Sequence, residues 1–296
     1  MTDVFIAGSL HWDVVVDAPR LPRLDETLMG RCVDYRFGGK GGNQAVSAAR
    51  MGASVAMAGR IGRDDAGRRL RATLDASGVD HTQVLECDTP SGMSVAIIDE
   101  RGDYGAVVVS GANKTLAADD IALPRDLKVL LLQNEVPEDV NLTLAQCSKD
   151  GACVILNAAP ARRMSDDLLA CIDVLVVNRV EAAELIGAEA ERLDVEAAAR
   201  ALCAMGPATA IVTLGADGLA IADAAGVERL DAFCVEAVSS HGAGDMFCGA
   251  LASEIARGAT AREACRFGAA AAALAVSTPF EARDRIAEGD VHRLLR

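Results

Sequence analysis

The stretch "HGAGDMFCGAL", residues 241–251, places an acid directly after three small residues, where a helical pattern begins. Gly242, Ala243 and Gly244 let a ligand approach the backbone closely, and a helix start adds unsatisfied N–H groups and the positive end of its dipole. Such a turn suits phosphate or a phosphoryl group in transfer. Asp245 at the same end is placed to accept a proton from a hydroxyl nucleophile. The alternative is a plain helix start with a first-turn acid, and this stretch alone leaves both open.

A second glycine cluster, "FGGKGGNQAVSAARMG" at residues 37–52, also leads into a helical pattern. It is not a Walker A loop, because Lys40 is followed by Gly41 and not by Ser or Thr. It is not a clean dinucleotide fingerprint either, since no core strand immediately precedes it. Exposed backbone beside Lys40 and Asn43 fits a polyhydroxylated small molecule. The alternative is a tight turn with a glycine N-cap.

Two further motifs lie where a strand ends. In "VNRVEAAEL", Asn178 and Glu181 are three residues apart and share one helical face. Such a pair can hold a hydrated Mg2+ beside phosphate oxygens, and the same spacing is that of a helix capping box, so both interpretations can hold. The stretch "VTLGADGL", residues 212–219, ends a strand in a glycine turn, at the side where open α/β sheets bind ligands.

The segments that position these motifs alternate between short apolar runs and alanine-rich helical patterns. This alternation predicts a mainly parallel sheet covered by helices on both faces. The predicted strands fall at residues 4–10, 53–62, 128–135, 153–160, 173–178 and 209–215, and the predicted helices at 41–52, 64–78, 137–151, 166–172, 179–187 and 195–206.

Two stretches depart from the alternation. "DETLMGRCVDYRF" and "SGMSVAIIDERGDYGAVVVSGAN" have the pattern of antiparallel strands and turns, with a hairpin-like turn between Asp99 and Gly105. We expect one domain over residues 1–296, with a small second sheet inserted at about 12–37 and 91–111. The alternative is an irregular surface meander.

Composition limits the classes of protein. The 296 residues are 51% hydrophobic, which is enough for a large core, and the formal net charge of −14 argues against a general nucleic-acid or anionic-membrane binder. Nine cysteines without a C-x-x-C pair and four scattered histidines predict small buried cysteines and neither a disulfide framework nor a His metal cluster. The first residues lack the basic leader of a signal peptide and no apolar run has membrane-spanning length, so we expect a cytoplasmic protein.

The order of these motifs resembles the ribokinase-like, or pfkB, family of carbohydrate kinases over nearly the whole chain. "GGKGGNQAVSAARMGA" is similar to the family's N-terminal signature and "HGAGDMFCGAL" to its C-terminal one. "GGKGGN", with "GSLHWD" upstream and "VVVSGAN" in the middle, is more similar to ribokinases than to adenosine kinases. The resemblance implies a three-layer α/β fold with a central, mainly parallel sheet, and a small β-sheet lid that forms a homodimer contact.

The resemblance also implies roles for individual residues. Asp245 matches the base that takes the proton from the sugar hydroxyl, and Gly242, Ala243 and Gly244 match the anion hole for the γ-phosphate of ATP. Asn178 and Glu181 match the element near the ATP phosphates and Mg2+. The sugar-contacting positions correspond to His11, Asp13, Gly39, Lys40, Asn43 and Glu135. The nucleotide-binding loop corresponds to the stretch that contains Thr213, Gly215 and Gly218.

Two departures from the ribokinase pattern matter. Ribokinases carry an Asp of a monovalent-cation site where this chain has Ser239, and their other cation ligands come from a glycine-containing loop that reads "STPFEARDRI" here. We therefore predict that a K+ site is absent. His11 stands where ribokinases generally have Asn, and it either faces the sugar or packs beneath the pocket. His241 is expected to be a solvent-facing turn residue.

The function predicted from the sequence is an ATP-dependent kinase for ribose or a related furanose. A nucleoside kinase on the same fold and a catalytically weak sugar or nucleotide sensor are the alternatives. Retention of Asp245, Gly244 and Glu181 argues against the sensor.

Overall fold

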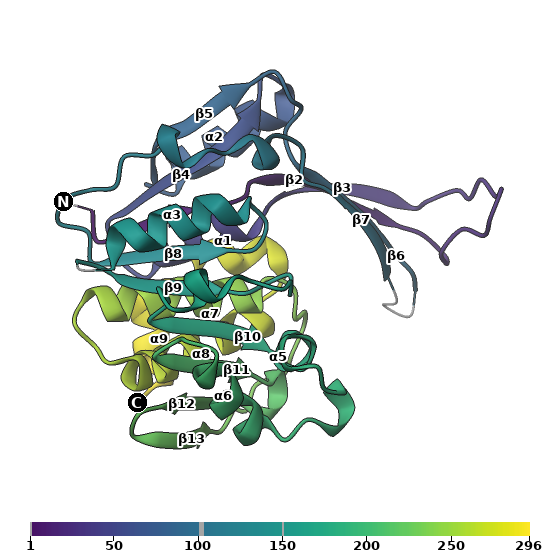
Figure 1. Ribbon diagram of the computed structural model, residues 1–296. Helices are drawn as coiled ribbons and strands as arrows, with labels where there is room; N and C mark the ends of the chain where they lie inside the picture. Colours follow the sequence, from purple (N-terminus) through teal and green to yellow (C-terminus); the bar gives the residue numbers. More distant parts are fainter. Residues whose placement is uncertain (1, 101–103, 150) are drawn as a thin grey trace.

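The computed structural model describes residues 2–100, 104–149 and 151–296, and its central feature is a nine-stranded sheet (Figure 1). The strands lie in the order β13-β12-β11-β10-β9-β8-β1-β4-β5. Pairing is parallel from β11 to β5, and β12 and β13 extend the sheet antiparallel. In chain order the strands are β1 (Val4–Ala7), β4 (Val55–Gly62), β5 (Asp80–Cys87), β8 (Val129–Gln133), β9 (Cys153–Asn157), β10 (Val174–Asn178), β11 (Thr209–Thr213), β12 (Leu219–Asp223) and β13 (Gly226–Leu230).

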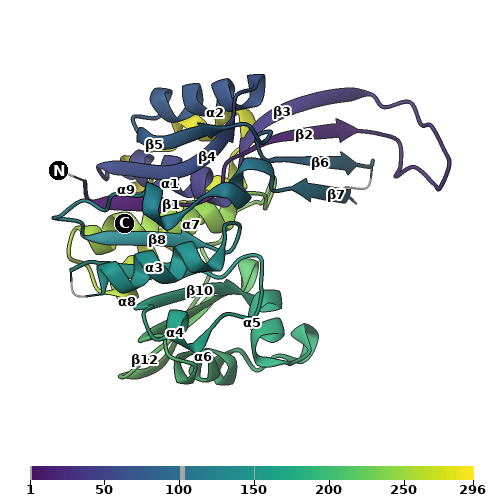
Figure 2. The same ribbon diagram turned by 45° about the horizontal axis from the view of Figure 1, so that its top comes forward.

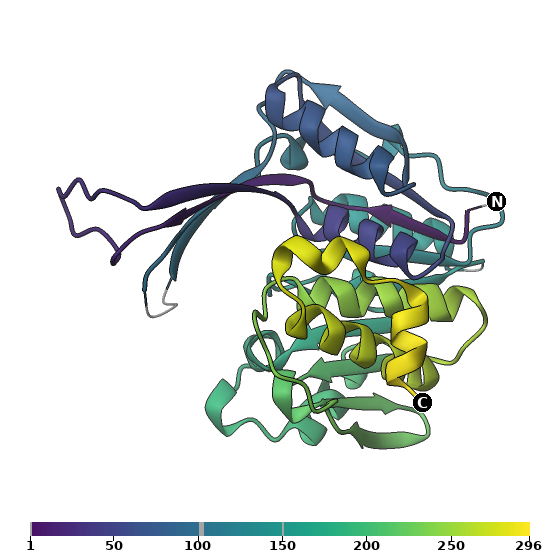
Figure 3. The ribbon, with the colours of Figure 1, turned by 180° about the vertical axis from the view of Figure 1, so that it is seen from behind.

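Helices cover both faces of this sheet, as the alternating pattern predicts. One buried cluster joins the sheet to α3, α4, α5 and α6, and the other joins it to α1, α2, α7 and α8, which are in front in Figure 3. Strand β8 is buried along its whole length because helices cover it on both sides. The helices are α1 (Lys40–Arg50), α2 (Asp65–Ala76), α3 (Glu138–Ser148), α4 (Asp166–Leu169), α5 (Arg179–Ile186), α6 (Val195–Ala204), α7 (Ala243–Ala256), α8 (Ala261–Ser277) and α9 (Glu288–Leu294).

A separate four-stranded sheet, which we call the lid, projects from the main body (Figure 2). Its order is β3 (Cys32–Gly38), β2 (His11–Asp17), β6 (Met93–Ile98) and β7 (Tyr104–Val109). The expectation of antiparallel strands is wrong for one pair: β2 and β6 run parallel. Between the β2–β3 pair and the β6–β7 pair the chain passes through α1, β4, α2 and β5, and β6 then runs in the same direction as β2. The predicted turn between Asp99 and Gly105 includes residues 101–103, which lie outside the described residues.

Three strands of the main sheet were not predicted from the sequence: β5, β12 and β13. Strand β5 mixes polar and apolar residues because it is an edge strand, partly open to solvent.

The expectation that the cysteines are buried is wrong for three of them, since Cys32, Cys147 and Cys234 are exposed. Within the described ranges no three His, Cys, Asp or Glu side chains gather in a way that could hold a metal ion. None of the described helices has the length and apolar character needed to cross a membrane.

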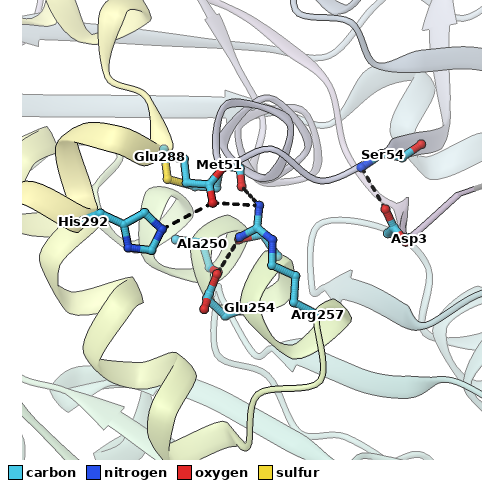
Figure 4. A network of polar contacts seen from close by, with 9 residues as sticks. Asp3, Met51, Ser54, Ala250, Glu254, Arg257, Glu288 and His292 are labelled. Atoms are coloured by element: carbon cyan, nitrogen blue, oxygen red, sulfur yellow. Dashed lines mark hydrogen bonds and ion pairs between the residues drawn. The ribbon is translucent and has the colours of Figure 1, made fainter. Parts of the chain in front are cut away.

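Helices α1 and α7 pack side by side and run parallel. Gly249 makes this approach possible: a Cβ there would lie 2.5 Å from Ser47 Cβ and 2.7 Å from Gln44 O. At the C-terminal ends, Arg257 donates to Met51 O at 2.6 Å and pairs with Glu254 at 2.5 Å and Glu288 at 3.3 Å (Figure 4). Glu288 belongs to α9, so this network fastens the last helix to the pair.

Candidate active site

The N-terminal ends of α1 and α7 meet at a cleft on the carboxyl edge of the parallel strands. Asn157 and Asn178, the last residues of β9 and β10, line this cleft together with Thr213 at the end of β11. Lys40 at the start of α1 and Asp245 in the first turn of α7 line it from the other side. Parallel strands present their carboxyl ends to ligands in this type of sheet, and two helix N-termini add positive potential.

Asp245 is the third residue of α7 and is only 8% exposed. Its Oδ1 accepts a hydrogen bond from Gln44 Nε2 at 3.0 Å and its Oδ2 accepts one from Asn43 Nδ2 at 3.2 Å. Burial raises the pKa of Asp245 above its ordinary value, while the Lys40 ammonium and the two amides oppose this shift. The result is a fixed carboxyl group with increased basicity, which is what a general base needs.

A chain of buried amides orients Gln44. Gln133 Nε2 donates to Gln44 Oε1 at 2.8 Å, so the Gln44 amide nitrogen faces Asn157 Oδ1 and Asp245 Oδ1. Asn157 Nδ2 in turn donates to Val176 O at 3.1 Å. Sequence reasoning missed Gln44, Gln133 and Asn157. The available signal was a polar residue at the end of each apolar strand and a glutamine directly after Asn43.

The turn before α7 presents backbone to the cleft. Gly242, the N-cap, has φ 75°, a left-handed conformation that favours glycine, and both Gly242 and Gly244 line the cleft. First-turn N–H groups have no partner within their own helix, so they are free for an anion. Ala243, the third residue of the predicted anion hole, does not line the cleft as Gly242 and Gly244 do. Its N–H donates to Ser240 O at 3.3 Å and so already has a partner.

The start of α1 is fixed by Glu135. Glu135 Oε2 accepts from the Lys40 backbone N–H at 2.8 Å and from the hydroxyl of Ser9. Gly39 has φ 85°, and a Cβ there would lie 2.7 Å from His11 N. Burial alone would lower the pKa of the Lys40 ammonium, but the carboxylates of Asp245, Glu135 and Glu181 outweigh burial and raise it. Lys40 is therefore a permanent positive charge in the cleft.

Asn178 and Glu181 form the predicted capping box and also line the cleft. The Glu181 N–H donates to Asn178 Oδ1 at 2.9 Å, and the Asn178 N–H donates to Glu181 Oε2 at 2.8 Å. Burial raises the pKa of Glu181, and Lys40 opposes the shift. Oxygen Oε1 of Glu181 accepts no hydrogen bond from the described residues, which leaves it free for a ligand.

His11 and Asp13 lie on β2, where the lid meets the main body. Asp13 Oδ1 accepts from Ser94 N at 3.1 Å and from Ser94 Oγ at 2.6 Å. His11 is 3% exposed and packs against Gly92, and its Nε2 has no hydrogen-bond partner in the described part of the chain. His241, by contrast, is exposed, as expected.

The glycine turn after β11 lies beside the cleft and contributes only its first residue to the wall. Thr213 lines the cleft and donates through Oγ1 to Val177 O at 3.3 Å. Gly215 and Gly218 have φ values of 61° and 81° and shape the turn into β12, without lining the cleft. A Cβ added at Gly215 would meet no described atom within 4 Å, so this part of the turn is open to a ligand.

Comparison with known proteins by family model, by sequence and by structure gives matches to carbohydrate kinases. Residues 1–282 match the model of the pfkB family carbohydrate kinases. A ribokinase from Haemophilus influenzae is 34% identical over 280 residues, covering 92% of this chain and 91% of the relative. A deoxyribokinase from Salmonella typhi is 34% identical over 259 residues, covering 84% of each chain. The structure of Arabidopsis thaliana ribokinase complexed with ribose and ATP superimposes with a TM-score of 0.92 at 29% identity, covering 100% of this chain and 99% of that one.

Proposed function

The chain belongs to the pfkB family of carbohydrate kinases, which transfer a phosphoryl group to an alcohol, and we propose that it phosphorylates a hydroxyl of ribose or a related furanose with ATP. The observation that carries this proposal is the buried Asp245 carboxyl at the start of α7, held by two amides beside an open glycine turn.

In this proposal Asp245 accepts the proton of the sugar hydroxyl as that oxygen attacks the γ-phosphorus. Asn43 and Gln44 keep the carboxylate in one orientation, so no rearrangement is required when the substrate arrives. The raised pKa makes Asp245 a stronger base than a solvated aspartate.

The charge that develops on the phosphoryl oxygens is stabilised by groups already in place. Gly242, the N-cap of α7, and Gly244 in its first turn line the cleft and offer backbone N–H groups there, and the Lys40 ammonium adds a full positive charge. Glu181, with its free Oε1, and the neighbouring Asn178 are suited to hold Mg2+ through its water molecules. The metal ion, when bound, neutralises charge on the nucleotide phosphates.

We place the sugar between the lid and the start of α1. Asp13 lies on β2, Gly39 and Asn43 at the start of α1, and Glu135 bonds the backbone of Lys40 there. His11 is buried beside them, and its Nε2 has no hydrogen-bond partner among the described residues. Thr213 and the open Gly215 turn lie on the other side of Asp245, where the nucleotide would bind.

A second candidate substrate is 2-deoxyribose. The deoxyribokinase relative has the same identity to this chain as the ribokinase relative, 34%, over 259 residues instead of 280. Substrate choice between the two depends on groups that meet the 2-hydroxyl, because a site built to bond a hydroxyl discriminates strongly against its absence.

The test is ADP release with a panel of ribose, 2-deoxyribose, other furanoses and nucleosides, with Asp245→Asn as the inactive control. We expect one pentose to give the highest kcat/KM. Binding of a sugar or of ATP without turnover in the unmutated protein would overturn the kinase proposal in favour of a sensor. A higher kcat/KM for a nucleoside than for any sugar would show that the protein is a nucleoside kinase.

We also propose that turnover does not need K+. The side chain at position 239 is a neutral hydroxyl that accepts from His241 N at 3.4 Å, and a hydroxyl is a weaker cation ligand than a carboxylate. Rates in K+ and in tetramethylammonium should agree within a factor of about two, since no ion-dependent step is involved. Several-fold activation by K+ would contradict this.

Finally, we propose a homodimer through the lid. Tyr35, Val14, Val95 and Val107 stand in register across β3, β2, β6 and β7 and so form an apolar row on one face. Tyr35 is 57% exposed and Val107 68%, and exposed apolar rows of this kind mark contact surfaces. Analytical ultracentrifugation should show a dimer that Val107→Asp converts to monomer, whereas a monomeric unmutated protein would exclude this contact.

A further inference from the structure

The guanidinium of Arg283 lies directly behind the turn that precedes α7. Arg283 belongs to the short 3₁₀ helix η5 (Phe280–Arg285) and is only 7% exposed. Its Nε donates to Thr278 O at 3.0 Å, its Nη2 to Ser239 O at 2.7 Å and its Nη1 to His241 O at 2.5 Å. All three nitrogens thus bind backbone carbonyls.

This environment is unusual for a buried arginine. No carboxylate in the described part of the chain forms an ion pair with Arg283, although burying a cation without an opposite charge is costly. Burial and the nearby Arg36 guanidinium lower the pKa of Arg283, but an arginine stays protonated throughout the physiological range. The Glu281 carboxylate opposes this shift, and the Phe280 ring centroid lies 5.8 Å from Arg283 Cζ. The direct hydrogen-bond partners of the guanidinium are the three backbone carbonyls.

The bond to His241 also determines where the next amide points. The carbonyl of His241 and the N–H of Gly242 belong to one planar trans peptide, so they point to opposite sides. Because the carbonyl faces Arg283 behind the turn, the Gly242 N–H faces away from it, and Gly242 lines the cleft. A cation on the carbonyl side polarises this peptide and strengthens its N–H as a donor.

The other hydrogen bonds of this turn are local: His241 N donates to Ser239 Oγ at 3.4 Å and Ala243 N donates to Ser240 O at 3.3 Å. Ser240 and His241 are exposed, and the left-handed Gly242 could adopt other conformations at low cost. The preceding residues are held by the N–H groups of Val238 and Ser239, which donate to Val276 O. The guanidinium is the group that ties both Ser239 and His241 to the end of α8.

We propose that Arg283 is a positioning residue, a built-in cation that holds the carbonyls of Ser239 and His241 so that the amide of Gly242 faces the transferring phosphoryl group. This inference rests on the proposed phosphoryl transfer. It also explains the proposed independence of K+, because the guanidinium already engages the carbonyls on this side of the turn.

The first test compares Arg283→Met with Arg285→Met. Methionine keeps much of the side-chain volume but removes the charge and all donors, and Arg285 is an exposed neighbour with the same loss of charge. We expect Arg283→Met to lower kcat by about 10- to 100-fold, since small displacements of catalytic groups have effects of this size. The KM for the sugar should change less than about two-fold, and Arg285→Met should leave kcat and KM unchanged.

Nucleotide affinity separates a role at the γ-phosphate from general damage. Calorimetry without sugar should show that Arg283→Met weakens ATP binding several-fold and leaves ADP binding unchanged, because only ATP carries the group that the turn contacts. Guanidinium ions at millimolar concentration should restore part of kcat in Arg283→Ala, and Na+ at equal ionic strength should not.

Unchanged kcat in folded Arg283→Met would overturn the proposal, as would an equal loss of ATP and ADP affinity. If the methionine variant does not fold, Arg283→Lys takes its place: one ammonium cannot reach three carbonyls, so kcat must still fall while ADP affinity stays constant. If the unmutated protein turns over no sugar, the proposed kinase function fails, yet the ATP and ADP affinities still decide the role of Arg283.

Discussion

Helices α1 and α7 run parallel, and the groups that join their N-terminal ends differ in kind from those that join their C-terminal ends. At the N-terminal ends, Asp245 is buried, accepts from the neutral amides of Asn43 and Gln44, and has a raised pKa. At the C-terminal ends, Arg257 pairs with Glu254 and Glu288 in partly exposed ion pairs.

The difference shows two uses of charge on one helix pair. The buried Asp245 carboxyl keeps a raised pKa, although the Lys40 ammonium opposes the shift, and it is suited to accept a proton. Glu254 and Glu288 instead pair with Arg257 and link secondary-structure elements. Substitutions at both ends of the pair test this contrast, from the largest expected effect to the smallest.

Asp245→Asn should abolish most of the activity. Asparagine has the same shape, but it cannot accept a proton. Its single acceptor oxygen can also take only one of the two hydrogen bonds that Asn43 and Gln44 donate. We expect kcat to fall by about 10³-fold with a small change in KM, measured by ADP release with the best sugar. A loss of less than about ten-fold would show that Asp245 is not the base and that the two helix ends do not differ in function.

Gln44→Met should lower activity by about 10-fold, because it removes one of the two donors that orient Asp245. The buried amides of Gln133 and Asn157 would also lose a partner, so some loss of stability is expected as well. Comparing kcat at saturating substrate with the melting temperature separates the two effects. Unchanged kcat in a folded variant would mean that Asn43 alone orients the base.

Gly249→Ala probes the contact between the two ends. An added Cβ would lie within 2.7 Å of three atoms of α1, from Ser47, Ala48 and Gln44, so the helices must move apart. We expect the free energy of unfolding to decrease by about 1–3 kcal/mol in denaturant titrations. The displacement of the helices should also lower kcat. An unfolding free energy of Gly249→Ala equal to that of the unmutated protein would show that the helices separate without cost.

The difference in stability between the unmutated protein and Asp245→Asn should depend on pH. Burial raises the pKa of Asp245, so the folded state binds this proton more tightly than the unfolded state. The resulting stabilisation is complete below the unfolded pKa, about 4, and is lost as the pH rises through the raised folded pKa. The stability of the asparagine variant relative to the unmutated protein should therefore be higher at pH 8 than at pH 4, and thermal melts of both proteins at the two pH values measure this change. The same difference at both pH values would contradict the raised pKa.

Arg257→Ala should have the smallest effect. Its ion pairs are partly exposed and worth little, and its hydrogen bond to Met51 O can be replaced by water. We expect a loss of about 0.5–1 kcal/mol in unfolding free energy and unchanged kcat and KM. A large loss of activity would show that the two ends of the helix pair are coupled.

The sequence predicted the fold class and the motifs well, because both depend on local patterns. Apolar runs such as Val129–Gln133 and the glycine turn before Asp245 are recognisable from neighbouring residues alone. The sequence missed β5, whose edge position makes its pattern partly polar. It also could not show that β2 and β6 pair in parallel, since the pairing of Val14 with Val95 depends on the path of the whole chain between them.

The sequence by itself determined which residue types stand at each strand end and helix start, because spacing along the chain fixes those positions. Only the tertiary structure decided which of them meet. Gln44 orients Asp245 across 201 positions, and Arg283 reaches the carbonyls of Ser239 and His241 across 44 and 42. Backbone carbonyls are present at every residue, so no pattern of side chains could reveal that a buried guanidinium would bind these two and that of Thr278.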